Sequence, residues 1–121
     1  MSSDISFDTT YETFQETVIE ASFSRPILVD IWADWCAPCL VLAPVLNTVL
    51  KNYAGKIALA KVDVDQGENM KIAGRYNVRG FPTVILFFHG EEKGRFHGAK
   101  PKSEIKSFID SLIGDSENPA D

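Results

Sequence analysis

The chain is poor in cysteine and in long apolar runs. Among its 121 residues there are two cysteines, Cys36 and Cys39. A disulfide between them closes a very small loop, removes little entropy from the unfolded chain and therefore stabilises little. The apolar runs, such as Val84 to Phe88, are far too short to cross a bilayer. These shortages argue against a disulfide-stapled scaffold and a membrane protein, and they leave the cysteine pair as a candidate for chemistry.

Basic charge is also scarce. The chain has 12 Lys and Arg against 17 Asp and Glu, a formal net charge of −5. Nucleic-acid-binding proteins concentrate Lys and Arg on one face, so this balance predicts no nucleic-acid partner. The first residues, Met1 to Asp4, form neither the basic nor the apolar region of a secretory signal, and we expect a cytoplasmic protein.

Helical and strand patterns alternate along the chain, which is typical of an α/β fold with helices on both faces of a sheet. Apolar runs predict strands at 27–31, 57–64 and 83–88, with a turn at 89–92 and a short last strand near 95–97. Apolar residues at helical spacing predict helices over 11–18, 42–53, 70–76 and 105–113. Thr9 to Glu12 fits a capping box for the first of these helices. With no repeat and no linker, residues 1–121 are predicted to be a single domain ending in a flexible acidic tail, 115–121.

The cysteine pair stands between a predicted buried strand and a predicted helix, in the sequence Trp35-Cys36-Ala37-Pro38-Cys39. The free N–H groups and the positive dipole end of a helix N-terminus stabilise a thiolate, which predicts a lowered pKa for Cys36. Cys36 is therefore the expected nucleophile on a substrate disulfide. Cys39, one helical turn further on, is expected to resolve the mixed disulfide and release the reduced substrate.

Three other interpretations of the pair compete with redox chemistry. A zinc site needs two more ligands, and the candidates His89 and His97 have a spacing that does not fit the usual pattern. A structural disulfide is disfavoured by the small loop, and a reducing compartment disfavours it further. Two buried, inert thiols fit poorly with the position between a strand and a helix. We therefore expect a redox pair and no metal.

Five sequence blocks carry a resemblance to the thioredoxin family. The segment from Val29 to Cys39 is similar to the family's active-site signature, and the likeness runs from about Phe7 to Gly114. The other blocks follow in the expected order: Ala43-Pro44, Ala60 to Asp65, Arg79 to Thr83, and Gly98-Ala99. The resemblance implies the thioredoxin fold, a mixed central β-sheet flanked by four α-helices, and a protein-disulfide reductase.

Two charged residues within apolar strands gain a role from this resemblance. Burial should raise the carboxyl pKa of Asp30, which would then exchange a proton with Cys39 during resolution. Lys61, in the next strand, is expected to modulate Asp30. The alternative is a structural carboxylate paired with Lys61.

The resemblance also implies a substrate-binding surface. Pro82 is similar to the family's cis-proline, which faces the cysteines and lets Phe81 offer its backbone to an extended substrate. The predicted apolar rim consists of Trp35, Ala37, Pro38, Phe81, Gly98 and Ala99. Trp32 is expected to pack beneath the site.

Three residues depart from the family pattern. Ala37 replaces the common glycine between the cysteines and restricts the backbone conformations open to the turn. Leu40 stands where many members carry lysine, which should make Cys36 slightly less acidic and the rim more apolar. His97 replaces an aliphatic residue, either as a surface histidine or as a source of pH sensitivity near the cleft.

The resemblance implies a monomer with no cofactor besides its redox-active cysteines. The chain has no nucleotide-binding glycine loop, so NADPH is expected to act only through a thioredoxin reductase. The expected partners are that reductase and disulfide-containing protein substrates. Two other functions stay open at this point, a disulfide oxidant or isomerase and a redox-silent chaperone or binding module.

Overall fold

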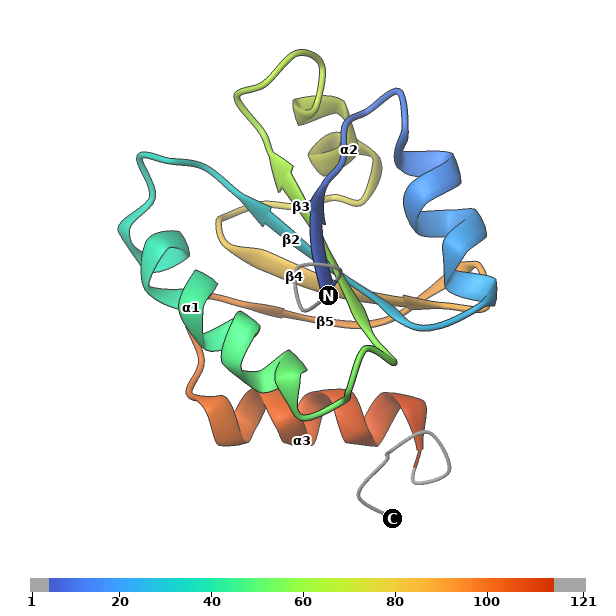
Figure 1. Ribbon diagram of the computed structural model, residues 1–121. Helices are drawn as coiled ribbons and strands as arrows, with labels where there is room; N and C mark the ends of the chain where they lie inside the picture. Colours follow the sequence, from blue (N-terminus) through green and yellow to red (C-terminus); the bar gives the residue numbers. More distant parts are fainter. Residues whose placement is uncertain (1–4, 115–121) are drawn as a thin grey trace.

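The most apolar stretch of the chain forms the central strand of the sheet. Strand β2 (Ile27–Trp32) pairs in parallel with β3 (Ala58–Asp63) and antiparallel with β4 (Thr83–Phe88). A strand covered on both faces needs a nearly continuous apolar sequence, and in β2 only Asp30 interrupts it. The outer strands β1 (Ser6–Asp8) and β5 (Glu91–His97) complete one mixed sheet of order β1-β3-β2-β4-β5 (Figure 1).

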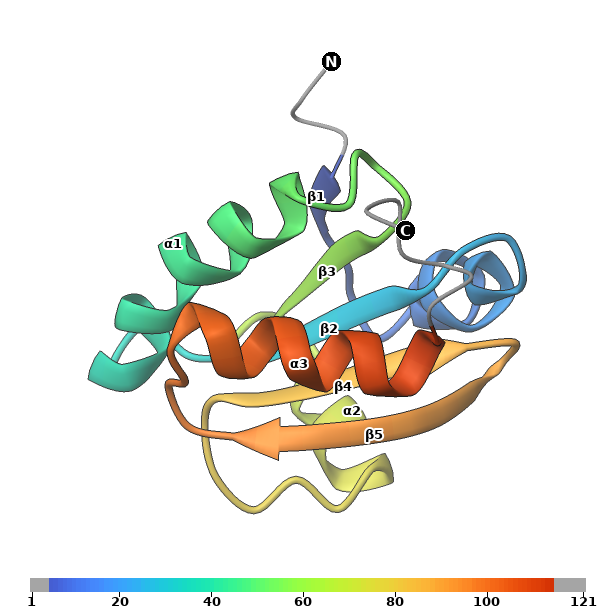
Figure 2. The same ribbon diagram turned by 90° about the horizontal axis from the view of Figure 1, so that it is seen from below.

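Helices cover both faces of this sheet in the computed structural model, which describes residues 5–114. On one face α1 (Ala37–Lys51) and α3 (Lys102–Ile113) pack against Leu28, Leu59 and Val84 (Figure 2). On the other face, the π-helix η2 (Gln15–Glu20), the 3-10 helix η3 (Ala21–Phe23) and α2 (Met70–Arg75) lie over a second apolar cluster. None of the helices within residues 5–114 is long and apolar enough to cross a membrane.

The predicted fold class is confirmed, and three local predictions are wrong: the type of the first helix, its capping box and the length of the last strand. The first helical segment is a π-helix followed by a 3-10 turn. Thr9 and Glu12 do not form the predicted capping box, because Thr9 is buried and its hydroxyl is hydrogen-bonded to the hydroxyls of Thr13 and Thr17. Instead, the backbone N–H of Thr10 donates to Thr13 Oγ1 and the backbone N–H of Thr13 donates to Thr10 Oγ1.

The last strand is longer than predicted. It begins at Glu91, because His89 and Gly90 form the whole turn with φ values of 56° and 84°. Two successive residues with positive φ are typical of the tight turns that join twisted hairpin strands. The predicted tail, 115–121, lies outside the described residues.

Candidate active site

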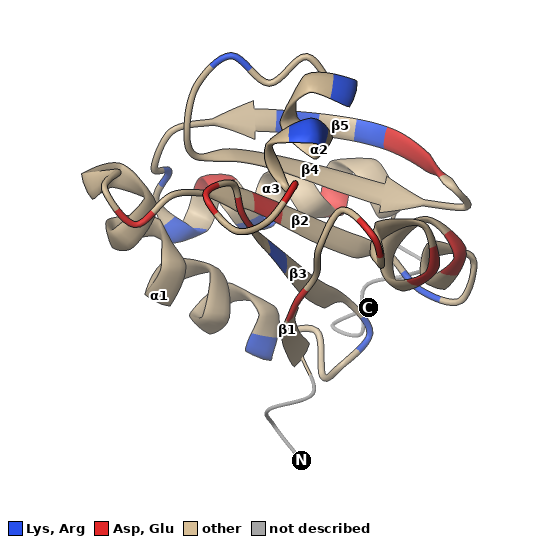
Figure 3. Cartoon of the chain, turned by 90° about the horizontal axis from the view of Figure 1, so that it is seen from above, with Lys and Arg blue, Asp and Glu red and all other residues tan. Residues whose placement is uncertain are grey.

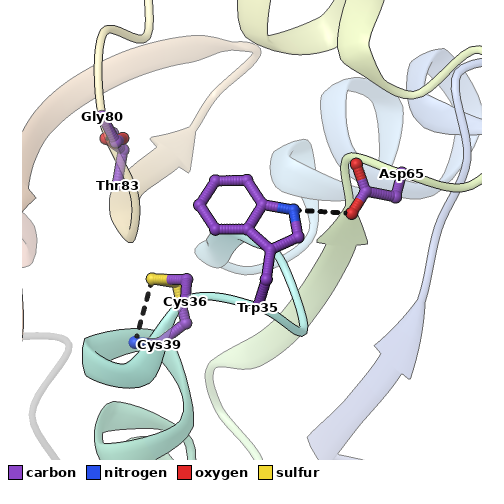
Figure 4. The surroundings of a disulfide bond; sticks show 6 residues. All are labelled: Trp35, Cys36, Cys39, Asp65, Gly80 and Thr83. Atoms are coloured by element: carbon purple, nitrogen blue, oxygen red, sulfur yellow. Dashed lines mark hydrogen bonds between the residues drawn. A yellow bond between two sulfur atoms is a disulfide. The ribbon is translucent and has the colours of Figure 1, made fainter.

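The two cysteines lie where β2 has ended and α1 begins. Cys36 is the N-cap of α1 with extended backbone (φ −99°, ψ 103°), and the Cys39 backbone N–H donates to Cys36 Sγ at 3.3 Å. Pro38 occupies the first turn, where its missing N–H removes no helical hydrogen bond. The cysteines are joined by a disulfide, with their Cα atoms 5.3 Å apart (Figure 4).

The two sulfur-bearing residues differ in their surroundings. Cys36 is 5% exposed, whereas Cys39 is 1% exposed and faces the interior from the first turn of α1. Ala37 and Pro38, between them, are exposed. An incoming disulfide therefore meets Cys36 before Cys39. The positive dipole end of α1 and the Cys39 N–H, which is shared between Cys36 O and Cys36 Sγ, favour the thiolate form of Cys36.

Asp30 is a buried carboxyl beneath α1. It is 1% exposed, and it shares a sheet face with Leu28 and Val84, which belong to the same buried apolar cluster as Leu42 of α1. Burial raises the pKa of Asp30 from 3.8 to about 7, and the Lys61 charge offsets part of this rise. Its Oδ1 atom has no hydrogen-bond partner among residues 5–114. A carboxyl that titrates near neutrality, with an uncommitted oxygen, is suited to exchanging a proton.

Lys61 lies beside Asp30 in the parallel register of β2 and β3. Its ammonium stands over the Trp32 ring, 5.1 Å from the centroid, and forms no ion pair with Asp30 within the described part of the chain. Trp32 and Lys61 line a hollow of about 310 Å³ that Asp8 and Asp63 also border. Lys61 therefore acts on Asp30 through its field rather than by direct contact, and the alternative of a closely paired structural carboxylate is not observed.

An exposed tryptophan stands beside the disulfide. Trp35 is 65% exposed, and its Nε1–H donates to Asp65 Oδ2 at 2.9 Å (Figure 4). The ring of Phe81 meets the Trp35 ring edge-on, with centroids 5.9 Å apart. The two aromatic rings, from segments far apart in the chain, therefore form one apolar surface next to Cys36.

The chain opposite the disulfide turns at a cis peptide bond. The Phe81–Pro82 bond is cis, as the resemblance implies. Gly98, with a φ of 81°, donates its N–H to Pro82 O at 2.9 Å, and Ala99 beside it is exposed. The predicted rim residues of both segments therefore lie together.

Charge is missing from the outer face of α1 next to the site. Figure 3 shows no charged residue along this helix before Lys51 at its end. Leu40 is 53% exposed and Val41 is 61% exposed, directly after Cys39. The apolar rim therefore extends onto α1.

Sequence reasoning missed three contributors to the site: Val41, Asp65 and Thr83. Val41 is the second of two exposed apolar residues after Cys39, a signal visible in the sequence. Asp65 accepts a hydrogen bond from Trp35, which lies 30 residues earlier in the chain. Thr83 Oγ1 is hydrogen-bonded to Nδ1 of His97, which lies 14 residues later. Such contacts have no local sequence signal.

The two histidines considered as zinc ligands lie far apart. His89 is in the turn that precedes β5, and His97 is the last residue of that strand. A strand rises about 3.3 Å per residue, which separates the two histidines by roughly 20 Å or more. They cannot both join the cysteines around one ion.

A dithiol pair at a helix start, with an exposed aromatic rim and a buried carboxyl, defines a thiol–disulfide oxidoreductase. The family model for thioredoxin matches residues 6–111. This chain therefore belongs to the thioredoxin family, and its activity is the reduction of protein disulfides by dithiol–disulfide exchange.

Individual relatives agree with this assignment. The chain is 43% identical to thioredoxin C-2 of Corynebacterium nephridii, over 88% of this chain and 94% of the relative. It is 41% identical to a thioredoxin of Pseudomonas aeruginosa, over 84% of this chain and 90% of the relative. It is also 46% identical to the chloroplastic M-type thioredoxin of Zea mays, over 75% of this chain and 53% of that relative.

The burial of Asp30 predicts that the oxidised protein loses stability as the pH rises. Folded Asp30 keeps its proton up to about pH 7, whereas an unfolded aspartate loses it near 3.8. The folded state thus binds more protons between these pH values. The free energy of unfolding should fall from about pH 4 and level off above about pH 7, by up to ~4 kcal/mol.

Guanidinium unfolding of the oxidised protein between pH 4 and 8 measures this fall. Asp30→Asn should remove most of it, whereas Asp34→Asn, at an exposed carboxylate, should not. Parallel pH profiles for the wild type and Asp30→Asn would contradict the prediction.

Proposed function

We propose that Cys36 attacks the substrate disulfide and that Cys39 completes the exchange. The position of Cys36, as the more exposed residue of the pair at the N-terminus of α1, is the observation that carries this proposal. The Cys36 thiolate forms a bond to one substrate sulfur, and the substrate S–S bond breaks. The other substrate sulfur leaves as a thiolate and takes a proton from solvent.

The second step consumes the mixed disulfide. Cys39 loses its proton and attacks Cys36 Sγ, which forms the intramolecular disulfide and releases the second substrate thiolate. Two electrons have then passed from the protein to the substrate. The Cys39 proton needs an acceptor in the interior, and Asp30, with its pKa raised to about 7 by burial, is suited to take it. Lys61 assists by favouring the ionised form of Asp30.

The polypeptide that carries the disulfide docks on the apolar rim. Trp35 and Phe81 supply its aromatic part, and the exposed residues Ala37, Pro38 and Ala99 border it. Gly98 and Pro82 hold the backbone opposite the cysteines. A small apolar surface suits brief contact with many substrates.

The oxidised protein must be reduced again before the next cycle. We infer that an NADPH-dependent thioredoxin reductase supplies the electrons, and that the protein works as a monomer in the cytoplasm. The bacterial relatives support this setting, while the chloroplastic relatives indicate the plastid as the alternative compartment.

The division of labour between the cysteines predicts opposite behaviour for two variants. Cys39→Ser should accumulate a mixed disulfide with an oxidised protein substrate, because the resolving thiol is gone. Cys36→Ser should form almost none, although it retains one thiol. Non-reducing gels and mass spectrometry of the adduct measure both. Equal trapping by the two variants would refute the assignment of Cys36 as nucleophile.

The proton role of Asp30 predicts a selective defect. Asp30→Asn should slow resolution by about 100-fold or more at pH 7, since general acid–base groups contribute roughly 10²- to 10⁴-fold. Alkylation of Cys36 by iodoacetamide should continue at nearly the wild-type rate. Stopped-flow measurement of both steps tests this, and unchanged turnover would rule out Asp30 as the proton acceptor.

The uncharged start of α1 predicts that a new cation there acidifies Cys36. Leu40→Lys should lower the pKa of the Cys36 thiol and speed its alkylation at pH 6.5 by about two- to fivefold. Thr48→Lys adds the same charge two turns further along α1, beyond about one Debye length, and should change little. Equal acceleration by both variants would contradict a local effect.

A further inference from the structure

His97 is tied to the loop that faces the disulfide. It is the last residue of β5 and lies opposite Thr83, the first residue of β4, in the antiparallel register. Cross-strand neighbours project from the same sheet face. His97 Nδ1 and Thr83 Oγ1 are 3.1 Å apart, a hydrogen-bond distance. One edge of an otherwise exposed imidazole therefore points inward to a fully buried hydroxyl.

The available protons fix the direction of this bond. The Thr83 hydroxyl has one proton, and it donates that proton to Gly80 O at 2.7 Å. Thr83 Oγ1 must then accept from His97, so Nδ1 carries a proton. The doubly protonated imidazolium also has a proton on Nδ1, so the bond is retained when His97 becomes charged.

The resulting chain of hydrogen bonds holds one end of the Gly80–Phe81–Pro82 loop. His97 orients Thr83, and Thr83 holds Gly80 O. At the other end of the loop, Gly98 holds Pro82 O. Figure 4 shows Gly80 and Thr83 across from Cys36 and Trp35. The backbone between the two anchors is the part that a substrate polypeptide would meet.

We propose that His97 is a positioning residue for polypeptide substrates, acting through the His97 Nδ1–Thr83 Oγ1–Gly80 O chain of hydrogen bonds. This inference rests on the proposed function and deepens it. These hydrogen bonds fix the conformation of the loop against which the substrate polypeptide lies, and they take no part in the sulfur chemistry. Loss of the bond should therefore weaken docking and leave the rate of exchange within the bound complex nearly unchanged.

Matched substitutions separate the two ring nitrogens. The side-chain amide of Asn lies as many bonds from Cβ as Nδ1 does, whereas the amide of Gln matches Nε2. In His97→Val and His97→Gln, the KM for an oxidised protein such as insulin should rise about three- to tenfold, the range expected for one lost hydrogen bond. His97→Asn should stay within about twofold of the wild type. The kcat should stay within about twofold in all three.

A small disulfide serves as the control substrate, because it does not dock on the Gly80–Phe81–Pro82 loop. The reaction of each reduced variant with 5,5′-dithiobis(2-nitrobenzoic acid) should proceed at the wild-type rate. Unchanged KM in His97→Val, failure of His97→Asn to retain the wild-type KM, or an equal loss with the small disulfide would each overturn the proposal. Failure of the wild type to reduce either substrate would instead refute the proposed function.

The protonated ring nitrogen also has a spectroscopic signature. In nitrogen-detected correlation spectra of the neutral imidazole, the proton should reside on Nδ1 in the wild type and in Thr83→Ser. In Thr83→Val, which lacks the hydroxyl, this preference should disappear. A proton found on Nε2 in the wild type would overturn the proposal.

Discussion

The site depends on one placement, a cysteine sulfur at the N-cap of α1. A thiolate is favoured there by the positive dipole end of α1, and the Cys39 N–H is shared between Cys36 O at 3.1 Å and Cys36 Sγ at 3.3 Å. The same placement sets the partner sulfur one turn inside the helix, where it is shielded. β2 fixes where this helix can begin, because its buried residues hold the preceding chain in the middle of the sheet. Redox chemistry here thus follows from how a central strand connects to a helix.

An ionised carboxyl in the middle of such a sheet is costly, because burial removes it from water. Asp30 interrupts an otherwise apolar strand, and burial holds it mostly protonated below pH 7. The destabilisation of its ionised form is the physical basis of its suitability as a proton acceptor beneath α1. Lys61 lies close enough to temper this effect, while its ammonium remains over Trp32 at the edge of the hollow. The pH dependence of stability and the proposed proton transfer therefore both depend on the Asp30 carboxyl.

The sequence predicted the elements whose signal is local. β2 is apolar except for Asp30 and β4 is apolar after Thr83, and the strand predicted over 83–88 matches β4 at both ends. The start of β5 was missed because Glu91 to Arg95 are mostly charged, as suits an edge strand, and resemble a loop. The π-helix was missed because Phe14 and Val18 fit an α-helix equally well. The cysteines were found from their strand and helix context, and Asp30 was found from the family resemblance and its place in an apolar strand. The bonds of Trp35 to Asp65 and His97 to Thr83 depend on distant segments.

The order in which the two thiols ionise tests this account most directly. Titration of the reduced protein, followed by the Cβ chemical shifts of both cysteines, resolves the two sulfurs separately. The account predicts that Cys36 is substantially ionised at neutral pH while Cys39 stays protonated to higher pH. A Cys36 that remained protonated well into the alkaline range, or a Cys39 that ionised first, would contradict it.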